Sequence, residues 1–232
     1  MRMRKKKNGD ARLARHEGLV MELPDAPLAR PEGREIFLEI GAGKGGFAIE
    51  MAKRNPQADY YAMERVKDCI VLAAEKADAE GRPENLRFII DTADALPSWF
   101  SEGAVDRIFL NFSDPWHKKG YFKRRLTYRK YLALYFSLLR EGGELCFKTD
   151  NVPLFDFSLE EIASVDLSPE VVTRDLHASV YAEGNVMTEY EENFVSQGMK
   201  IHMLRVKKPV GYLPHYTEPK RAKEKEEEET PV

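Results

Sequence analysis

The sequence predicts an α/β fold, in which a mostly parallel sheet has helices on both faces and an antiparallel hairpin at its carboxyl-terminal edge. From residue 35 to residue 163, apolar runs of strand length alternate with segments whose apolar residues have helical spacing. The first run, residues 36–40, ends in a glycine-rich turn that leads into a helix, which is the nucleotide-binding unit of such sheets. Two later strands, expected at residues 171–176 and 201–206, break the alternation and predict the hairpin.

The length of 232 residues fits one folded domain with a tail at each end. We expect residues 1–34 to form a basic arm and linker, residues 35–208 the domain, and residues 209–232 a charged tail. The net charge of -3 conceals a basic start, a basic middle segment and a run of glutamates near the end. Two distant cysteines, no apolar run of membrane-spanning length and no metal-ligand spacing predict a cytoplasmic protein without a metal. Monomer and homodimer both remain open.

The glycine-rich turn, Gly-Ala-Gly-Lys-Gly-Gly at residues 41–46, admits two kinds of nucleotide ligand. Its spacing satisfies the dinucleotide pattern G-x-G-x-x-G. Glu39, however, precedes the first glycine by two residues, where its carboxylate would repel a pyrophosphate and attract a ligand with an ammonium and a sulfonium group. The glycines allow a tight turn and close approach of the backbone to the ligand. We therefore expect S-adenosylmethionine at this turn, and a glycine turn without a ligand is the alternative.

Acidic residues follow the next two expected strands. Glu64 ends the strand at residues 59–64, where it would accept hydrogen bonds from ribose hydroxyls of either cofactor. The strand at residues 85–90 is followed by Asp91 and Asp94, and one of them would accept a hydrogen bond from the adenine amino group. The Asp-Ala-Leu-Pro turn favours Asp94 without fixing the register, and a role for Asp94 as a helix cap is the alternative.

The loop after the fourth strand, residues 105–111, has the sequence Asn-Phe-Ser-Asp-Pro-Trp at residues 111–116. Ligands of open α/β sheets bind beyond the carboxyl ends of the strands, so this loop is expected beside the glycine turn. Asp114 offers a carboxylate and Trp116 a flat ring. The loop resembles that of methyltransferases acting on amino or ring nitrogens, in which a planar base is positioned against one face. Packing of Trp116 in the core is the alternative.

A basic segment with interleaved aromatic residues follows this loop. Residues 117–130 contain seven lysines and arginines, three tyrosines or phenylalanines and no acid. Cations neutralise phosphates and aromatic faces stack on unpaired bases, so the segment predicts a nucleic-acid partner. Its position directly after the loop indicates that the nucleic acid is the substrate. The basic cluster at residues 2–7 fits the same partner or a solvated terminus.

The remaining segments complete the domain. We expect a helix at residues 126–139, a fifth strand at residues 144–149 that ends at Asp150, and a helix at residues 152–163. Thr188 and Glu191 have the spacing of a capping box for one more helix.

Together these segments resemble the bacterial tRNA (guanine-N7-)-methyltransferases. Members of that family have a Rossmann-like class I methyltransferase fold and methylate N7 of a guanine in the tRNA variable loop with S-adenosylmethionine. The resemblance covers residues 36–206 and rests on five motifs in order: Glu-Ile-Gly-Ala-Gly-Lys-Gly at 39–45, Asn-Phe-Ser-Asp-Pro-Trp at 111–116, Lys-Arg-Arg-Leu-Thr-Tyr at 123–128, Phe-Lys-Thr-Asp-Asn at 147–151 and Thr-Glu-Tyr-Glu at 188–191.

The resemblance implies a role for each matching residue. The residues implied to bind the cofactor are Glu39, Gly41, Gly43, Gly45, Glu64, Asp91 or Asp94, and Asp114. Those implied to bind the substrate guanosine are Lys118, Asp150, Thr188, Glu189, Tyr190 and Glu191. Those implied to contact RNA are Lys123, Arg124, Arg125, Leu126, Thr127 and Tyr128.

Asp114 and Asp150 are the expected catalytic residues, because carboxylates near the ring would stabilise the positive charge that develops on guanine. Three alternatives to this function remain: a methyltransferase for another RNA base, an NAD-dependent oxidoreductase, and an RNA-binding protein without catalysis.

Overall fold

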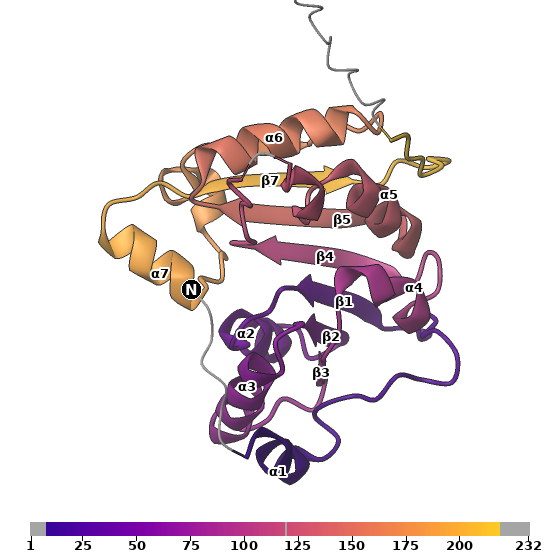
Figure 1. The fold of residues 1–232 in the computed structure, drawn as a ribbon, viewed down its shortest axis with the longest axis vertical. Helices are drawn as coiled ribbons and strands as arrows, with labels where there is room; N and C mark the ends of the chain where they lie inside the picture. The colour runs from indigo at the N-terminus through magenta and orange to yellow at the C-terminus, as the bar shows by residue number, and fades with distance from the viewer. Residues whose placement is uncertain (1–7, 119, 219–232) are drawn as a thin grey trace, which may run out of the picture.

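The computed structural model describes residues 8–118 and 120–218. Its centre is a seven-stranded sheet with the order β3-β2-β1-β4-β5-β7-β6 (Figure 1). β7 runs antiparallel to both of its neighbours, and all other neighbouring strands are parallel. The predicted α/β sheet with an antiparallel hairpin at its carboxyl-terminal edge is confirmed.

Most elements agree with the predicted ranges to within a few residues. The strands are β1 (Glu35–Ile40), β2 (Ala58–Met63), β3 (Leu86–Ile89), β4 (Val105–Asn111), β5 (Leu139–Thr149), β6 (Val171–Thr173) and β7 (His202–Lys207). The helices are α1 (Gly9–Leu13), α2 (Gly46–Arg54), α3 (Lys67–Ala79), α4 (Leu96–Trp99), α5 (Arg129–Leu138), α6 (Val152–Ala163) and α7 (Glu189–Ser196).

Three boundaries differ from the sequence prediction by three residues or more. β6 ends at Thr173, where the prediction ends at residue 176. β5 begins at Leu139 and takes in the expected turn at residues 140–143, because Leu139 pairs with Val105 before the register shifts. α5 begins at Arg129, three residues later than predicted, where the carboxylate of Glu161 accepts the backbone N–H of Arg129 at 2.7 Å.

Successive residues of β1 point to opposite faces of the sheet, and each face has its own core. Ile36 and Leu38 belong to the cluster that includes residues of α4, α5 and α6. Phe37 belongs to the cluster that includes residues of α2 and α3. Because helices cover both faces, β1 is apolar along nearly its whole length, as expected of a central parallel strand. The exceptions are Glu35, half-buried at the first position, and the buried Glu39, which shares the face of Phe37.

The segment before β1 packs against the domain, where the sequence predicts an arm and linker. Leu19 is buried in the α2 and α3 cluster, and its carbonyl accepts the backbone N–H of Phe88 at 2.8 Å along the edge of β3. Arg12, on α1, forms an ion pair with Glu75 of α3 at 2.6 Å. An apolar side chain and an ion pair therefore dock residues 8–34 on the sheet edge. The basic cluster at residues 2–7 lies outside the described part of the chain.

The first part of the predicted tail also packs against the domain. The Tyr212 hydroxyl donates to the carbonyl of Val165 at 2.6 Å, and its ring meets that of Phe136 at 5.9 Å. Residues 219–232 lie outside the described part of the chain. Within residues 8–118 and 120–218, no helix has the length and apolar character needed to cross a membrane.

Candidate active site

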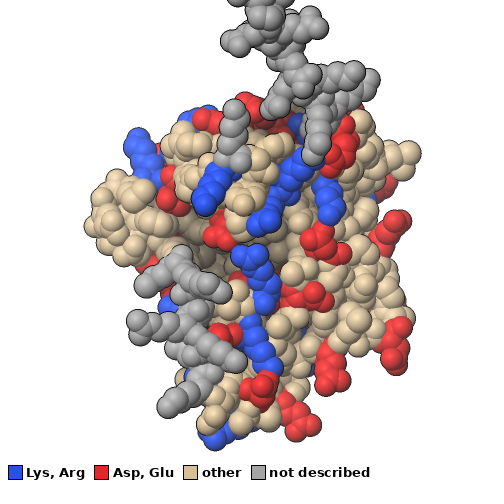
Figure 2. Space-filling model, in the orientation of Figure 1, with Lys and Arg blue, Asp and Glu red and all other residues tan. Residues whose placement is uncertain are grey.

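The carboxyl ends of the parallel strands meet at one edge of the sheet and bring the predicted acids together. Glu39 lies near the end of β1, Glu64 follows β2, Asp91 follows β3, Asp114 follows β4 and Asp150 follows β5. α7 lies beyond the arrowheads of these strands (Figure 1). On the face shown in Figure 2, lysine and arginine side chains border a hollow beside the lobe that contains α7. This edge is the candidate site.

The glycine turn adopts a backbone that side chains disfavour. Gly41, Gly43 and Gly45 have φ angles of 85°, 55° and 74°. The Gly41 N–H donates to the carbonyl of Met63 at 2.8 Å, which ties the turn to the end of β2. A Cβ on Gly45 would lie 2.8 Å from the Cβ of Ala73 in α3. The absence of side chains therefore allows the turn to bend and α2 and α3 to pack closely behind it.

Glu39 is buried, with 2% of its surface exposed, and one of its two carboxylate oxygens has no partner within the described part of the chain. The other oxygen, Oε1, accepts the side-chain N–H of Asn111 at 2.9 Å. Burial raises the Glu39 pKa to about 7, opposed by the Asn111 hydrogen bond and by the charge of Lys148. A buried carboxylate that has an oxygen without a hydrogen-bond partner and lies two residues before a glycine turn fits a ligand that carries a positive charge.

Glu64 is held beside the same turn by two backbone N–H groups. Its Oε2 accepts from Gly43 at 3.2 Å and its Oε1 accepts from Val66 at 2.8 Å. These contacts fix the carboxylate between the turn and the start of α3. They leave the expected ribose contact geometrically accessible, because each carboxylate oxygen has a second lone pair.

The two candidate aspartates after β3 have different surroundings. Asp91 accepts the indole N–H of Trp99 at 2.9 Å and the backbone N–H of the next residue. Asp94 is exposed and is bound to α5, where it accepts from Lys130 at 2.6 Å and from the Tyr131 hydroxyl at 3.0 Å. Both oxygens of Asp94 are therefore directed to α5, whereas Asp91 stays at the strand end.

The loop after β4 is strained and carries its aromatic ring at the surface. Phe112 and Trp116 have φ angles of 50° and 45°, which non-glycine residues rarely adopt and which concentrate at functional sites. The half-buried Trp116 ring lies between the guanidinium groups of Arg65, at 5.9 Å, and Arg124, at 5.2 Å. Asp114 is exposed and forms an ion pair with Arg65 at 3.4 Å. Trp116 thus links the end of β2 to the basic segment.

The basic segment presents some cations to solvent and uses another for packing. Lys118 is exposed, and Lys123 is nearly half exposed and pairs with Glu218 at 2.5 Å. Arg124 lies over the Trp116 ring as described above. Arg125 donates to a loop carbonyl at 2.8 Å and lies 4.3 Å from a phenylalanine ring of α6, so its guanidinium joins the loop to that helix.

The last three residues of the predicted RNA contact face inward. Thr127 and Tyr128 are buried, and Leu126 packs against the larger core. The Ser158 hydroxyl donates to the Thr127 hydroxyl at 2.8 Å, which joins this segment to α6. Their side chains support the exposed basic residues from below, so within residues 123–128 we expect side-chain contact with RNA from the exposed Lys123 and Arg124.

The Thr188 cap is confirmed, but Glu191 does not complete the capping box. Thr188 Oγ1 accepts the Glu191 backbone N–H at 3.0 Å and begins α7. The Glu191 carboxylate is 0% exposed and accepts from Lys148 at 2.6 Å, Asn185 at 2.7 Å and His177 at 3.0 Å. Sequence reasoning missed Lys148 as a functional residue, although a lysine inside a buried strand is itself a signal.

The other two residues of this motif lie on the surface of α7. Glu189 pairs with Lys76 of α3 at 3.0 Å and with Lys44 of the glycine turn at 3.4 Å. Tyr190 is 61% exposed. The start of α7 is thereby held across the glycine turn, with an aromatic ring free to meet a partner.

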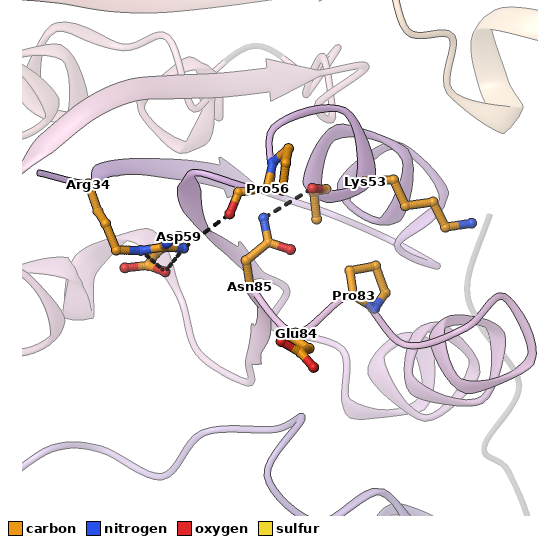
Figure 3. A pocket seen from close by; sticks show the side chains of 8 residues that line it. Arg34, Lys53, Pro56, Asp59, Pro83, Glu84 and Asn85 are labelled. Carbon is orange, nitrogen blue, oxygen red and sulfur yellow. Dashed lines mark hydrogen bonds and ion pairs between the residues drawn. The ribbon is translucent and has the colours of Figure 1, made fainter.

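A pocket of about 520 Å³ lies at the opposite edge of the sheet, where β2 and β3 begin (Figure 3). Most of its polar side chains are engaged within the protein: Arg34 pairs with Asp59 at 2.6 Å, and Lys53 pairs with Glu80 at 2.8 Å. The Asn85 amide donates to three backbone carbonyls. These contacts brace the loops at this edge. Among the residues that the structure describes, no three His, Cys, Asp or Glu side chains are placed to hold a metal ion.

The sheet order, the glycine turn and the acid at the end of β1 define a class I S-adenosylmethionine-dependent methyltransferase. The profile of a family described as "Putative methyltransferase" matches residues 33–204. A tRNA (guanine-N(7)-)-methyltransferase of Geobacillus sp. (strain WCH70) is 42% identical over 214 residues, and the match covers 90% of this chain and 96% of that protein. The chain belongs to the tRNA (guanine-N7-)-methyltransferase family.

Solved structures show the same fold at low sequence identity. The 16S rRNA methyltransferase KamB has a TM-score of 0.57 and 16% identity, over 88% of this chain and 95% of that chain. Geranyl diphosphate C-methyltransferase from Streptomyces coelicolor A3(2), solved with S-adenosyl-L-homocysteine, has a TM-score of 0.51 and 16% identity, over 84% of this chain and 79% of that chain.

Proposed function

We propose that this protein transfers the methyl group of S-adenosylmethionine to N7 of a guanine in the tRNA variable loop. The observation that carries the proposal is the buried Glu39 carboxylate, two residues before the glycine turn, which has one oxygen without a hydrogen-bond partner within the described residues and suits a cationic cofactor better than a pyrophosphate. The relative at 42% identity is a tRNA (guanine-N(7)-)-methyltransferase, which supports the same substrate. The unpaired cysteines, Cys69 and Cys146, fit a cytoplasmic enzyme. Both monomer and homodimer are compatible with this function.

The cofactor would be held by residues at the ends of the first three parallel strands. Glu39 would accept hydrogen bonds from the cofactor's ammonium group, and Glu64 would accept them from the ribose hydroxyls. The glycine turn would let the cofactor approach the backbone closely. For the adenine amino group we favour Asp91 over Asp94, because Asp91 is held close to the end of β3 by Thr92 and Trp99, whereas Asp94 is held to α5. When bound, S-adenosylmethionine supplies an electrophilic methyl group.

The chain's own task is to position the base. Guanine N7 carries an in-plane lone pair at neutral pH, so no strong base is needed and orientation supplies most of the acceleration. The base must leave its stacked position in the tRNA to present N7. Asp150, half-buried directly after β5, and Asp114, in the loop after β4, would stabilise the positive charge of the product ring. The exposed Lys118, Lys123 and Arg124 would bind the RNA phosphates.

The test is to incubate the protein with unmodified tRNA transcript and methyl-labelled S-adenosylmethionine, and to identify the labelled nucleoside. We expect 7-methylguanosine, and its loss when the variable-loop guanine is replaced. Label in a different nucleoside would overturn the proposed target while preserving the enzyme class. Tight tRNA binding without label would favour an RNA-binding protein.

Asp150→Asn tests the catalytic assignment. It keeps the shape of the side chain but removes the charge, so we expect kcat to fall about 100-fold, with cofactor affinity unchanged. The matched control is Asp156→Asn, which changes an exposed carboxylate of α6 that pairs with Arg174. Turnover by Asp150→Asn at the rate of the control would exclude a catalytic role.

A further inference from the structure

Lys148 is a buried lysine whose three ammonium protons all have acceptors. It lies on β5, two residues before Asp150, with 6% of its side chain exposed. Its Nζ donates to the Asn185 side-chain oxygen at 3.0 Å, the Val186 carbonyl at 2.9 Å and the Glu191 carboxylate at 2.6 Å. An ammonium has three donors, so this set satisfies it completely.

All three acceptors belong to one short segment, residues 185–191. This segment includes the start of α7 and the motif that the family resemblance assigns to the substrate guanosine. Lys148 therefore connects that segment directly to the strand that ends at Asp150.

Stability alone does not account for this lysine. Removing an ammonium from water is costly, and a buried ion pair is often no more stabilising than well-packed apolar residues of the same volume. Desolvation lowers the Lys148 pKa, while the Glu191 carboxylate opposes that change. The cost of burial points to a role in fixing geometry.

Lys148 also lies between the expected cofactor site, which contains Glu39, and the substrate segment, residues 185–191. Its ammonium is 5.2 Å from the Phe47 ring at the start of α2, and its charge acts on Glu39 and lowers the pKa of that carboxyl. The groups that face or act on Glu39 are Asn111 from β4, Lys148 from β5, and Glu64 and Tyr60 from β2 and its end. One cation is thus shared by the cofactor carboxylate and the substrate segment.

We infer that Lys148 is a positioning residue for the guanosine. It holds residues 185–191 at a fixed separation from Asp150, and Glu191 serves as its counter-ion in the free enzyme. Direct binding of guanine by Glu191 would require this carboxylate to leave three donors. This inference rests on the proposed tRNA methylation.

The first test is steady-state kinetics of Lys148→Met and Lys148→Arg. Lys148→Met keeps an unbranched chain without charge, and Lys148→Arg keeps the charge on a planar group that does not fit three converging acceptors. We expect both to lower kcat/KM for tRNA by about ten-fold or more, because small displacements of positioning groups are costly. The matched control is Lys208→Met, which changes a partly buried lysine directly after β7 that donates to the carbonyl of Leu139 at the start of β5.

The second test separates positioning from a general loss of structure. Binding of S-adenosylhomocysteine is followed across pH by calorimetry. Without the Lys148 charge the Glu39 carboxyl ionises at higher pH, so the midpoint of binding should move upward in Lys148→Met and stay in place in Lys148→Arg. A merely structural role would lower the bound fraction without this difference between the variants.

A double-mutant cycle with Glu191→Gln completes the design. If Lys148 acts through Glu191, the double variant loses no more kcat/KM than the worse single variant. Additive losses would overturn the inference, as would kcat/KM of Lys148→Met within about two-fold of wild type. If Lys148→Met does not fold, Lys148→Arg decides the question by the same criterion. Absence of tRNA methylation by the wild-type protein would instead reject the proposed function.

Discussion

Replacement of Glu39 by glutamine removes a buried carboxylate whose pKa lies near 7 in the folded protein, against an ordinary value of 4.5. The unfolded chain therefore releases this proton at lower pH than the folded protein does. Raising the pH from about 4.5 to about 7 then favours the unfolded state, so the stability contributed by the protonated group is lost across this window. One pKa unit corresponds to about 1.36 kcal/mol, so a difference of about 2.5 units changes the free energy of unfolding by about 3 kcal/mol.

Glu39→Gln has no such titration, although its amide oxygen still accepts the Asn111 hydrogen bond. We expect the free energy of unfolding of the variant, relative to wild type, to rise by about 3 kcal/mol between pH 4 and pH 8. Groups that titrate alike in both proteins cancel in this comparison. The assay is urea unfolding of both proteins, without cofactor, at a series of pH values.

Cofactor affinity should change with pH in the opposite direction to stability, because the ionised carboxylate binds the cofactor. With a pKa of about 7, wild-type affinity for S-adenosylhomocysteine should rise about ten-fold between pH 6 and pH 8, measured by calorimetry. Glu39→Gln should bind weakly and show no such rise. A neutral amide cannot attract the ammonium group, so the loss should be greatest at high pH.

Glu35→Gln is the matched control, since it alters a half-buried glutamate at the other end of β1. It should reproduce both wild-type pH curves. Parallel stability curves for wild type and Glu39→Gln would refute the argument, because they would show that the Glu39 carboxyl titrates alike in the folded and unfolded protein.

Three further changes test other parts of the site. Gly45→Ala should destabilise the protein by about 2–4 kcal/mol in urea unfolding, because the position has a positive φ and the new Cβ would contact α3. Gly43→Ala meets no atom within 4 Å and should cost about 1 kcal/mol. Equal losses would exclude a contribution from the contact between residue 45 and α3. Lys123→Ala should weaken tRNA binding and reduce its salt dependence by about one phosphate contact, and an unchanged slope in filter binding would remove Lys123 from the interface. Asp91→Asn should weaken cofactor binding more than Asp94→Asn does in calorimetry, and the reverse order would restore Asp94 as the adenine ligand.

The sequence predicts the sheet well because the signals are local. Apolar runs of strand length, helical spacing and a glycine turn are each contained in a few neighbouring residues. The Thr188 cap is equally local, since it depends on one hydroxyl and a backbone N–H three residues away. Because parallel strands end at one edge, the predicted order of elements also brings Glu39, Glu64 and Asp150 to the same side.

The docked ends of the chain escape this kind of reasoning. The sequence of the segment before β1 suggests a linker, because its prolines and charges obscure the scattered apolar residues that pack on the domain, of which Leu19 is fully buried. Its ion pair between Arg12 and Glu75 joins residues 63 positions apart. No pattern within the segment indicates that partner, so only the packed structure reveals that it covers the sheet edge.

The sequence by itself thus determined the fold class, the cofactor turn and the set of acids available at the strand ends, since each follows from local periodicity and spacing. The tertiary structure decided what each side chain does there. It turned Thr127 and Tyr128 inward, directed Asp94 to α5, and joined Lys148 to Glu191 across 43 positions of sequence. The physical reason is that burial and charge pairing depend on what other segments bring to the same place, and a carboxylate cannot show from its own neighbours whether a distant cation reaches it.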